Sequence, residues 1–256
     1  MDVLGKDRAR GLAKLHQAKW RRREGRVLLD SLPLIAEGLK NNLILELFYV
    51  PGEQLELVER AVALGIPVTA LAAGQLDRLS QVKTAPGMVA LACLPQMASL
   101  EDGGFNVASK SFLLYLDHIA DPGNLGTMAR SAAAFGCDGI LLSPGCADPF
   151  SPKSLRASAG SLLRMHLARG VLEDGHSWPV FYRAVAHGGD GLDALSGGGG
   201  RCGLWLGNEA HGPHPVPAGL EVQDITIAVA SSVESLNVTA AAAILCHALG
   251  ASRRAL

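Results

Sequence analysis

The sequence has few aromatic side chains, little charge and no long apolar run. Aromatic residues make up 5% of the 256 residues, too few for the wide base-stacking surface of a single-strand binder. No apolar stretch approaches the roughly 18–20 residues of a membrane span, and the N-terminal MDVLGKDRAR lacks the apolar core of a secretory signal. Five scattered cysteines, an odd number, favour reduced thiols over a disulfide framework. We therefore expect a cytoplasmic protein without a membrane partner.

The charge is small overall but unevenly distributed. Residues 1–26 contain nine basic and three acidic side chains, whereas the other 230 residues contain 14 basic and 21 acidic ones. The run KWRRREGR places Arg21, Arg22 and Arg23 where they could contact phosphates, because clustered cations displace bound counterions. A solvated helix face is the alternative and the more common outcome for such a run.

Hydrophobic periodicity predicts an α/β protein. With 48% hydrophobic residues and a net charge of −1, the chain can bury a core and is not a disordered segment. In the first half, strands are expected at 26–30, 43–50, 67–71 and 87–94, and helices at 31–41, 53–64 and 74–80. In the second half, strands are expected at 112–116, 139–142, 180–185, 204–206 and 225–229, and helices at 121–135 and 236–249.

The polar stretch between the two halves, interrupted by Gly103 and Gly104, predicts a linker. We therefore expect domains at residues 1–96 and 111–256, joined by a linker at 97–110. Alternating strands and helices in the second domain predict a mostly parallel sheet covered on both faces. Ligands bind such sheets outside the carboxyl ends of the strands. Here those ends are followed by loops at 117–124, 143–152, 186–191, 207–213 and 230–235.

Several short patterns do not identify a site. Gly198, Gly200 and Gly203 match a dinucleotide-binding fingerprint, but they precede a strand instead of following one. His211 and His214 have no further ligand at metal-binding spacing beyond a single glutamate, so no metal is expected. The absence of a GxxxxGK[ST] phosphate loop argues against an ATPase.

Three polar segments fall in the loops after the strands. DPGNLGTMAR (residues 121–130) delivers Asn124 at a turn, where it could simply cap the helix, and Arg130 about two helical turns later. Arg130 lies in an otherwise apolar stretch, and a buried guanidinium needs an anion that its own helix does not supply. LWLGNEAHG (residues 204–212) carries Glu209 after a strand. VESLNV (residues 233–238) opens a helix with Ser235 and Asn237, which could also be simple caps.

These segments resemble the three motifs of the SpoU (TrmH-type) family of RNA ribose 2′-O-methyltransferases, within the SPOUT superfamily. The patterns DPxNxGxxxR, LGxExxG and SLNV occur in the family's order and spacing. The stretch at 148–160 is similar to the family's intermediate segment, and the resemblance covers residues 111–250. Residues 1–94 more weakly resemble the small ribosomal-protein-like α/β domain that binds the substrate in many such enzymes.

The resemblance implies a C-terminal α/β domain with a trefoil knot, which forms a homodimer and binds S-adenosylmethionine in its knotted loops. Knots are nearly absent among folds, so the alternation alone predicts an ordinary doubly wound sheet. The residues implied at the cofactor are Ala186, Leu206, Gly207, Gly212, Ile227 and Leu236. The residues implied at the reacting hydroxyl are Asn124, Arg130, Glu209, Ser235 and Asn237. RNA contacts are expected from Arg21, Arg22, Arg23 and Arg156.

The implied activity is methylation of a ribose 2′-hydroxyl, a group that RNA carries and DNA lacks. A separate N-terminal domain with a basic helix favours ribosomal RNA of the 23S type, with transfer RNA as the second candidate substrate. The family usually has Ile-Pro-Met where this chain has Ile227-Ala228-Val229, and a glycine near Ser231, so a looser loop is expected. Two competing hypotheses stay open, a non-catalytic RNA-binding module of the same fold and an unrelated α/β metabolic enzyme.

Overall fold

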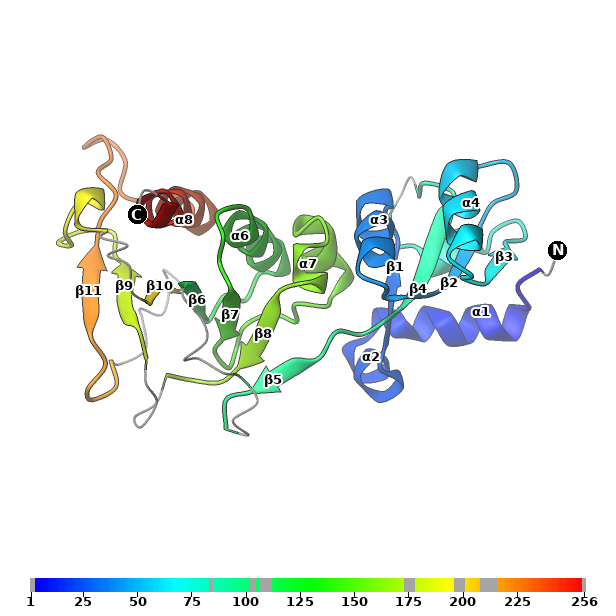
Figure 1. Ribbon diagram of the computed structural model, residues 1–256, viewed down its shortest axis with the longest axis horizontal. Helices are drawn as coiled ribbons and strands as arrows, with labels where there is room; N and C mark the ends of the chain where they lie inside the picture. The colour runs from blue at the N-terminus through cyan, green and yellow to red at the C-terminus, as the bar shows by residue number, and fades with distance from the viewer. Residues whose placement is uncertain are drawn as a thin grey trace. The chain divides into compact units, whose positions relative to one another are not determined.

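The computed structural model describes residues 3–82, 85–101, 105, 112–172, 178–195, 201–207 and 216–254. The chain divides into two compact units (Figure 1). The N-terminal unit comprises Met1–Pro95 together with Asp148–Arg164, and the C-terminal unit comprises Gln96–Ala147 and Met165–Leu256. This division differs from the expected domains in one main respect, because residues 148–164 pack with the N-terminal unit.

The N-terminal unit is built on a four-stranded mixed sheet in the order β1-β4-β2-β3. Its strands are β1 (Arg26–Leu29), β2 (Ile44–Tyr49), β3 (Val68–Ala70) and β4 (Met88–Cys93). β4 runs antiparallel to β1 and β2, whereas β3 is parallel to β2. The hydrophobic runs of the sequence predict all four strands to within one residue at each end.

Helices cover both faces of this sheet. They are α1 (Lys6–Ala13), α2 (Ala18–Glu24), α3 (Leu32–Lys40), α4 (Leu55–Ala63) and α5 (Leu76–Leu79), with a 3₁₀ turn η1 (Lys14–His16) between α1 and α2. Leu12 and Leu15 pack with Phe48 and Leu91 on one face. In Figure 1, α1 and α2 lie on that side of the strands, and α3 and α4 lie on the other. The basic run of the sequence forms α2, which ends at Gly25 in the left-handed conformation that favours glycine.

The segment Asp148–Arg164 contributes helix α7 (Pro152–Ala157) and the 3₁₀ turn η3 (Ser161–Leu163) to the N-terminal unit. Ser151 caps α7, because its hydroxyl oxygen accepts a hydrogen bond from the backbone N–H of Ser154 at 3.1 Å. The ion pairs that join the segment to the rest of the unit are Arg21–Asp148, Arg156–Asp30 and Arg164–Glu37. A helix of six residues is too short to show a hydrophobic period, so the sequence predicts no helix there.

The C-terminal unit is built on seven parallel strands in the order β11-β9-β10-β6-β7-β8-β5. They are β5 (Met97–Ser99), β6 (Phe112–Asp117), β7 (Gly139–Leu142), β8 (His166–Arg169), β9 (Val180–Ala184), β10 (Cys202–Gly207) and β11 (Val222–Ile225). The predicted linker at 97–110 is wrong for β5, which pairs with β8 at the sheet edge. β5 and β8 are too short for a recognisable hydrophobic pattern, so the sequence predicts neither strand. β11 begins three residues before the strand predicted at 225–229.

The strand order creates a crevice at the carboxyl edge of this sheet, between β6 and β10. After β6 the chain continues to β7 and β8 on one side, whereas β10 and β9 lie on the other side of β6. Gly207 at the end of β10 lies opposite Asp117 at the end of β6. Loops that leave neighbouring strands in opposite directions separate at such a point, which is where open parallel sheets bind ligands.

The two faces of the C-terminal sheet are covered differently. Helices α6 (Pro122–Ala134) and α8 (Val238–Arg254) pack against each other on one side of the strands (Figure 1). On the other face, Phe181 and Trp205 pack with Leu100 and Leu172, which belong to connecting segments. The sequence predicts that both faces of the sheet are covered. In the part of the chain that the structure describes, α-helices cover one face and connecting segments pack on the other. Among the same residues, no helix combines the length and apolar character needed to cross a membrane.

A close contact inside the C-terminal sheet gives a test of its packing. Gly203 on β10 has no side chain, and a Cβ atom added there would lie 2.3 Å from Cε1 of the buried Phe181 ring on β9. We expect Gly203→Ala to lower the free energy of unfolding by about 1–3 kcal/mol, because the ring has to move within a filled core. In a Phe181→Leu background the same substitution should cost less, since the ring is gone. Urea denaturation of the four proteins measures both costs, and equal costs would contradict this packing.

Candidate active site

Two neighbouring cavities open at the carboxyl edge of the C-terminal sheet. The first, the apolar cavity, has an empty volume of about 610 Å³ that includes its open mouth. It is lined by the end of β10, the segments that follow β9 and β11, residues 234–236 and one face of α8. The second, the polar cavity, is lined by the segment between β6 and α6, the end of β10 and the start of α8. Gly207 and Val238 line both, so the cavities share a wall.

The apolar cavity gathers residues that the family resemblance implies for the cofactor. Those that line it are Ala186, Leu206, Gly207, Ile227 and Leu236. Gly212, the sixth, lies outside the described residues. Ala186 follows β9, Leu206 and Gly207 end β10, and Ile227 and Leu236 follow β11, so the parallel arrangement of these three strands brings the residues together. Small and aliphatic side chains with backbone amides between them suit a flat ligand that is apolar on its faces and polar at its edges.

The two departures from the family pattern lie outside this lining. Ala228 and Ser231 are exposed to solvent, whereas Ile227 and Val229 on either side of Ala228 line the apolar cavity. The chain therefore keeps an apolar wall where the family usually has Ile-Pro-Met, although it lacks the fixed backbone angle of the proline.

The polar cavity contains two of the residues implied at the reacting hydroxyl. Asn124 and Asn237 both line it. Ser235 lines the apolar cavity, and Glu209 lies outside the described residues. Because the two cavities share a wall, the two asparagines lie next to the apolar cavity.

The turn before α6 leaves the capping of this helix to a residue other than Asn124. Asp121 caps α6, because its Oδ1 accepts a hydrogen bond from the backbone N–H of Asn124 at 2.8 Å. Pro122 occupies the first turn, where a missing N–H costs nothing and a fixed φ suits the helix. The expectation that Asn124 could cap the helix is therefore wrong, and α6 does not use its side-chain amide.

Asn237, in contrast, caps α8 and also faces the polar cavity. Its Oδ1 accepts a hydrogen bond from the backbone N–H of Thr239 at 2.9 Å and another from the Thr239 hydroxyl at 2.7 Å. These bonds fix the side chain at the start of the helix. Both bonds use the oxygen, and among the residues that the structure describes no hydrogen bond uses the amide N–H groups of Asn237, which can donate to a ligand. A cap and a positioning role are compatible at this residue.

Arg130 lies on α6 but is exposed to solvent. The expectation that its guanidinium is buried is therefore wrong, because this face of α6 is not covered by the C-terminal unit. Arg130 lines neither cavity, and within the described ranges it makes no ion pair. It follows Asn124 by six residues, about 9 Å along the helix axis. Arg130 therefore does not line the cavity that contains the two asparagines.

A buried acid that the motifs do not include lies at the same crevice. Asp117 ends β6 with its side chain fully buried. Its Oδ2 accepts a hydrogen bond from the indole N–H of Trp205 at 3.2 Å, and Nδ1 of His118 lies 3.1 Å from its Oδ1. Burial, followed by the charge of Asp117, raises the pKa of Tyr115 above its ordinary value, so this phenol stays neutral. The only sequence signal for Asp117 is its place at the start of the loop at 117–124.

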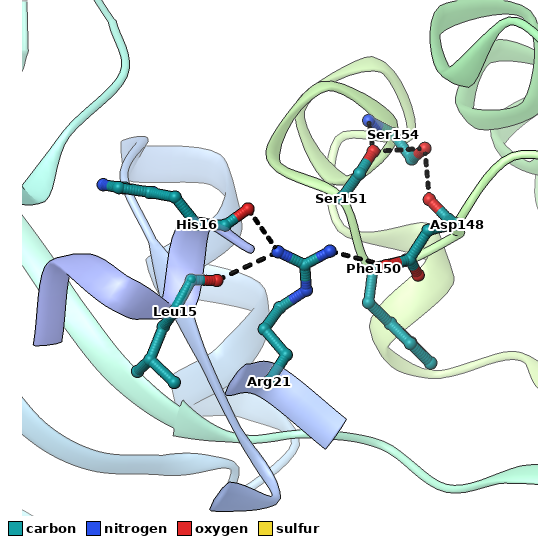
Figure 2. Close-up of polar contacts among 7 residues, drawn as sticks. All are labelled: Leu15, His16, Arg21, Asp148, Phe150, Ser151 and Ser154. Carbon is teal, nitrogen blue, oxygen red and sulfur yellow. Dashed lines mark hydrogen bonds and ion pairs between the residues drawn. The ribbon is translucent and has the colours of Figure 1, made fainter. Parts of the chain in front are cut away.

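Arg21, one of the arginines expected to contact RNA, is enclosed by protein. Its side chain is 3% exposed. Nη1 donates hydrogen bonds to the backbone carbonyls of Leu15 at 2.9 Å and His16 at 2.7 Å, and Nη2 donates to the carboxylate of Asp148 (Figure 2). The guanidinium cannot reach an RNA phosphate, so this expectation is wrong. Arg21 instead holds Asp148 on the N-terminal unit.

The other three arginines fall into two groups. Nη1 of Arg156 donates to both carboxylate oxygens of Asp30, at 3.0 and 3.3 Å, and its side chain is partly buried, so it too has a structural partner. Arg22 and Arg23 are exposed on α2, with Arg23 lying 3.6 Å from Glu24. Of the four arginines expected to contact RNA, only Arg22 and Arg23 are exposed and could contact a phosphate without first breaking an ion pair with an aspartate.

The cysteines and histidines that the structure describes do not gather into a metal site. Among the described residues, no three or more histidine, cysteine, aspartate or glutamate side chains lie close enough to hold a metal ion. His211 and His214 lie outside these residues. All five cysteines are free thiols, and burial raises the pKa of Cys246 to about 12, so it stays protonated at neutral pH.

Comparison with known proteins agrees with the motifs. The model of the SpoU rRNA Methylase family matches residues 111–247. A 23S rRNA (guanosine-2′-O)-methyltransferase of Bacillus subtilis is 29% identical over 244 residues, which cover 92% of this chain and 93% of that protein. The human mitochondrial rRNA methyltransferase 3 is 31% identical over 154 residues, which cover 59% of this chain, and this chain spans 37% of its length.

The fold also matches a solved structure. The AdoMet-bound rRNA methyltransferase from Sinorhizobium meliloti superposes with a TM-score of 0.77, over 100% of this chain and 97% of the other. The two sequences are 24% identical, so this likeness establishes the fold alone.

Arg21 and Arg22 are neighbours in different surroundings, which allows a matched test. We expect Arg21→Met to lower the free energy of unfolding by about 2–4 kcal/mol, because it removes three hydrogen bonds and leaves Asp148 without its cation. Arg22→Met should change it by less than about 0.5 kcal/mol, since Arg22 is exposed. Urea denaturation measures the difference, and hydrogen exchange within residues 148–164 should accelerate only in Arg21→Met. Equal behaviour of the two variants would contradict the anchoring role of Arg21.

Proposed function

The chain belongs to the SpoU rRNA Methylase family, and we propose on that premise that it transfers a methyl group from S-adenosylmethionine to a ribose 2′-hydroxyl of ribosomal RNA. The observation that carries this proposal is the convergence of five implied cofactor residues on one cavity, next to two asparagines in an adjoining cavity. The family supplies the reaction, and the geometry supplies adjoining places for the methyl donor and the hydroxyl.

The apolar cavity fits the adenosine part of the donor. Ile227 and Leu236 offer aliphatic contacts to the faces of a ring, and the backbone near Ala186 and Gly207 offers amide and carbonyl groups to its edges. Gly207 lacks a side chain at the wall shared with the polar cavity, so a ligand can approach that wall closely. When bound, S-adenosylmethionine supplies a methyl group that its sulfonium makes ready for transfer.

The protein has to activate the ribose hydroxyl, which is scarcely ionised at neutral pH. Its oxygen must be aligned with the methyl carbon, and its proton must be helped to leave. We assign the alignment to the amide groups of Asn124 and Asn237, with the hydroxyl of Ser235 as a third hydrogen-bonding group. Because the attack neutralises a sulfonium, no large oxyanion-binding site is needed. Glu209 is assigned either to hold Arg130 or to accept the proton.

Arg130 is assigned to the RNA phosphate beside the reacting ribose. A guanidinium has a pKa above about 12 and is a poor base, but it binds a phosphate through two parallel hydrogen bonds. Arg130 is exposed and lies about 9 Å along α6 from Asn124. Both facts support binding of an RNA phosphate by Arg130 outside the two cavities of its own chain.

A homodimer formed through the C-terminal unit would bring Arg130 to a cavity of the second copy. Ile244 on α8, the helix that packs against α6, is 37% exposed and offers an apolar position for a second copy to cover.

Ribosomal RNA is favoured over transfer RNA as the substrate. The 23S rRNA methyltransferase of Bacillus subtilis aligns with 92% of this chain, including the N-terminal unit, and not only with the residues around the cavities. The reacting hydroxyl is absent from DNA, so DNA is not a substrate. A cytoplasmic location belongs to the same proposal, supported by five cysteines that are all free.

Arg130 gives the sharpest test of the assigned roles. We expect Arg130→Ala to lower the rate of methyl transfer by at least about a hundredfold, because the RNA phosphate loses its clamp and the hydroxyl its alignment. The affinity for S-adenosylmethionine, measured by calorimetry, should stay within about twofold of the unmodified protein, a change below about 0.5 kcal/mol. Thr127→Ala, at another exposed position of α6, serves as the control. A loss of cofactor binding in Arg130→Ala would refute this division of roles.

The apolar cavity can be tested with two positions of one loop. Leu236 lines the cavity, whereas Val233 is 45% exposed and does not. We expect Leu236→Ala to weaken S-adenosylmethionine binding by about tenfold, since loss of an aliphatic contact costs about 1–2 kcal/mol. Val233→Ala should leave the affinity unchanged. Calorimetric titration of both variants decides the question, and similar affinities would place the donor elsewhere.

A further inference from the structure

The N-terminal unit contains a cavity that takes no part in the proposed reaction. It lies among α1, η1, α2 and the first residue of β1, with Leu91 of β4 at its wall. Its empty volume is about 780 Å³, including its open mouth. Pockets of a few hundred cubic ångströms are large enough to enclose most of a small ligand. This cavity is called the α1–α2 cavity below.

The inner wall of the α1–α2 cavity is apolar and includes one indole ring. Leu12, Leu15 and Leu91 line it and are buried. Trp20 of α2 is partly buried against the same hydrophobic cluster and presents its ring to the cavity. The Nζ atom of Lys14 lies 4.8 Å and the Cζ atom of Arg23 lies 5.1 Å from the centre of this ring, so a base that stacks on the ring has to displace one of these two cations.

The mouth of the cavity has an excess of positive charge. Lys14 and Arg26 are exposed lining residues, and neither makes an ion pair among the residues that the structure describes. Arg8, the third cation of the lining, is already paired with Glu46, so it adds no free charge. Glu24 supplies the lining with a carboxylate, at 3.6 Å from Arg23. An anionic group at this mouth would meet two cations that the protein itself does not neutralise.

We propose that the α1–α2 cavity binds one unpaired nucleotide of the RNA substrate. The base stacks on Trp20 above the leucine floor, its phosphate pairs with Lys14 and Arg26, and Glu24 accepts a hydrogen bond from an amino group of the base. The identity of the ligand as RNA rests on the proposed function. The combination of aromatic face, apolar floor and free cations matches the two chemically different halves of a nucleotide.

Such a site distinguishes unpaired from paired RNA. In a double helix both faces of a base are stacked and its edge is paired, so the base cannot reach Trp20 without leaving the helix. Arg22 and Arg23 on the exposed side of α2 can contact phosphates of either form. The basic surface of α2 binds paired and unpaired RNA alike, and the α1–α2 cavity makes the protein prefer RNA with an unpaired nucleotide in a bulge or loop.

The experiment compares RNA hairpins that differ in one nucleotide. One hairpin is fully paired, and four others carry a single bulged A, C, G or U at the same position. Binding to the full-length protein is measured by fluorescence anisotropy at one fixed salt concentration, because phosphate contacts depend strongly on salt. The variants are Trp20→Leu, Trp20→Phe and Arg26→Gln, with Lys40→Gln as the matched control. Lys40 is an exposed cation at the end of α3, away from the cavity.

The unmodified protein should bind at least one bulged hairpin about tenfold more tightly than the paired one. Trp20→Leu should remove this preference, since base stacking on an aromatic ring contributes about tenfold or more in affinity. Trp20→Phe should restore most of it, because phenylalanine keeps an aromatic face. Arg26→Gln should weaken the bulged hairpins more than the paired one, whereas Lys40→Gln should leave the preference unchanged. Circular dichroism shows whether each variant is folded, and Arg26→Gln carries the test if Trp20→Leu is not.

Two results would overturn this proposal. One is equal affinity of the unmodified protein for the paired hairpin and all four bulged ones. The other is a folded Trp20→Leu or Arg26→Gln variant that keeps the full preference. Methyl transfer by the unmodified protein is assayed separately with ribosomal RNA. A protein that methylates without the preference refutes the nucleotide site alone, whereas one that shows the preference without methylating refutes the proposed reaction alone.

Discussion

The candidate active site depends on the common direction of the seven strands in the C-terminal unit. Because all of them run parallel, their carboxyl ends lie at one edge of the sheet, and the segments that follow β6, β9 and β11 meet the end of β10 there. The chain leaves β6 toward β7, whereas β10 lies on the opposite side of β6, and both cavities lie at the end of β10. Gly207 then becomes the shared wall of a cavity with aliphatic lining and one with two asparagines. In the proposed function, the methyl donor and the ribose hydroxyl meet across this wall, which Val238 also lines.

The basic N-terminal segment shows that clustered charges can serve different purposes. Arg21 points into the protein and holds Asp148, because two backbone carbonyls and a carboxylate accept hydrogen bonds from its two Nη atoms. Arg22, the next residue, faces solvent. Lys14 and Arg26 frame a cavity with an indole ring. Successive side chains along a helix point in directions about 100° apart. Of two adjacent arginines, Arg21 can therefore form a buried ion pair while Arg22 stays exposed and available to a ligand.

Much of the fold follows from local patterns. The apolar runs at residues 112–116 and 139–142 specify buried parallel strands, and the Asp-Pro turn before α6 specifies a helix start, because these features involve contacts within a few residues. Strands β5 and β8 have too few residues to form a pattern. β8 is a strand because it pairs with β7 and β5, and β5 is a strand because it pairs with β8. Helix α7 is likewise short, and Arg21 and Asp30, more than a hundred residues away, decide where its segment packs.

The sequence by itself determined the α/β class, the family motifs and the types of side chain available for methyl transfer. These are properties of residues close together in the chain, where a dihedral preference or a cap is enough. Only the tertiary structure decided that Asp121 and not Asn124 caps α6, that Arg130 is exposed, that Arg21 and Arg156 form ion pairs, and that a cavity lies beside Trp20. Burial and cavity walls depend on which distant segments pack together, and no local pattern contains that information.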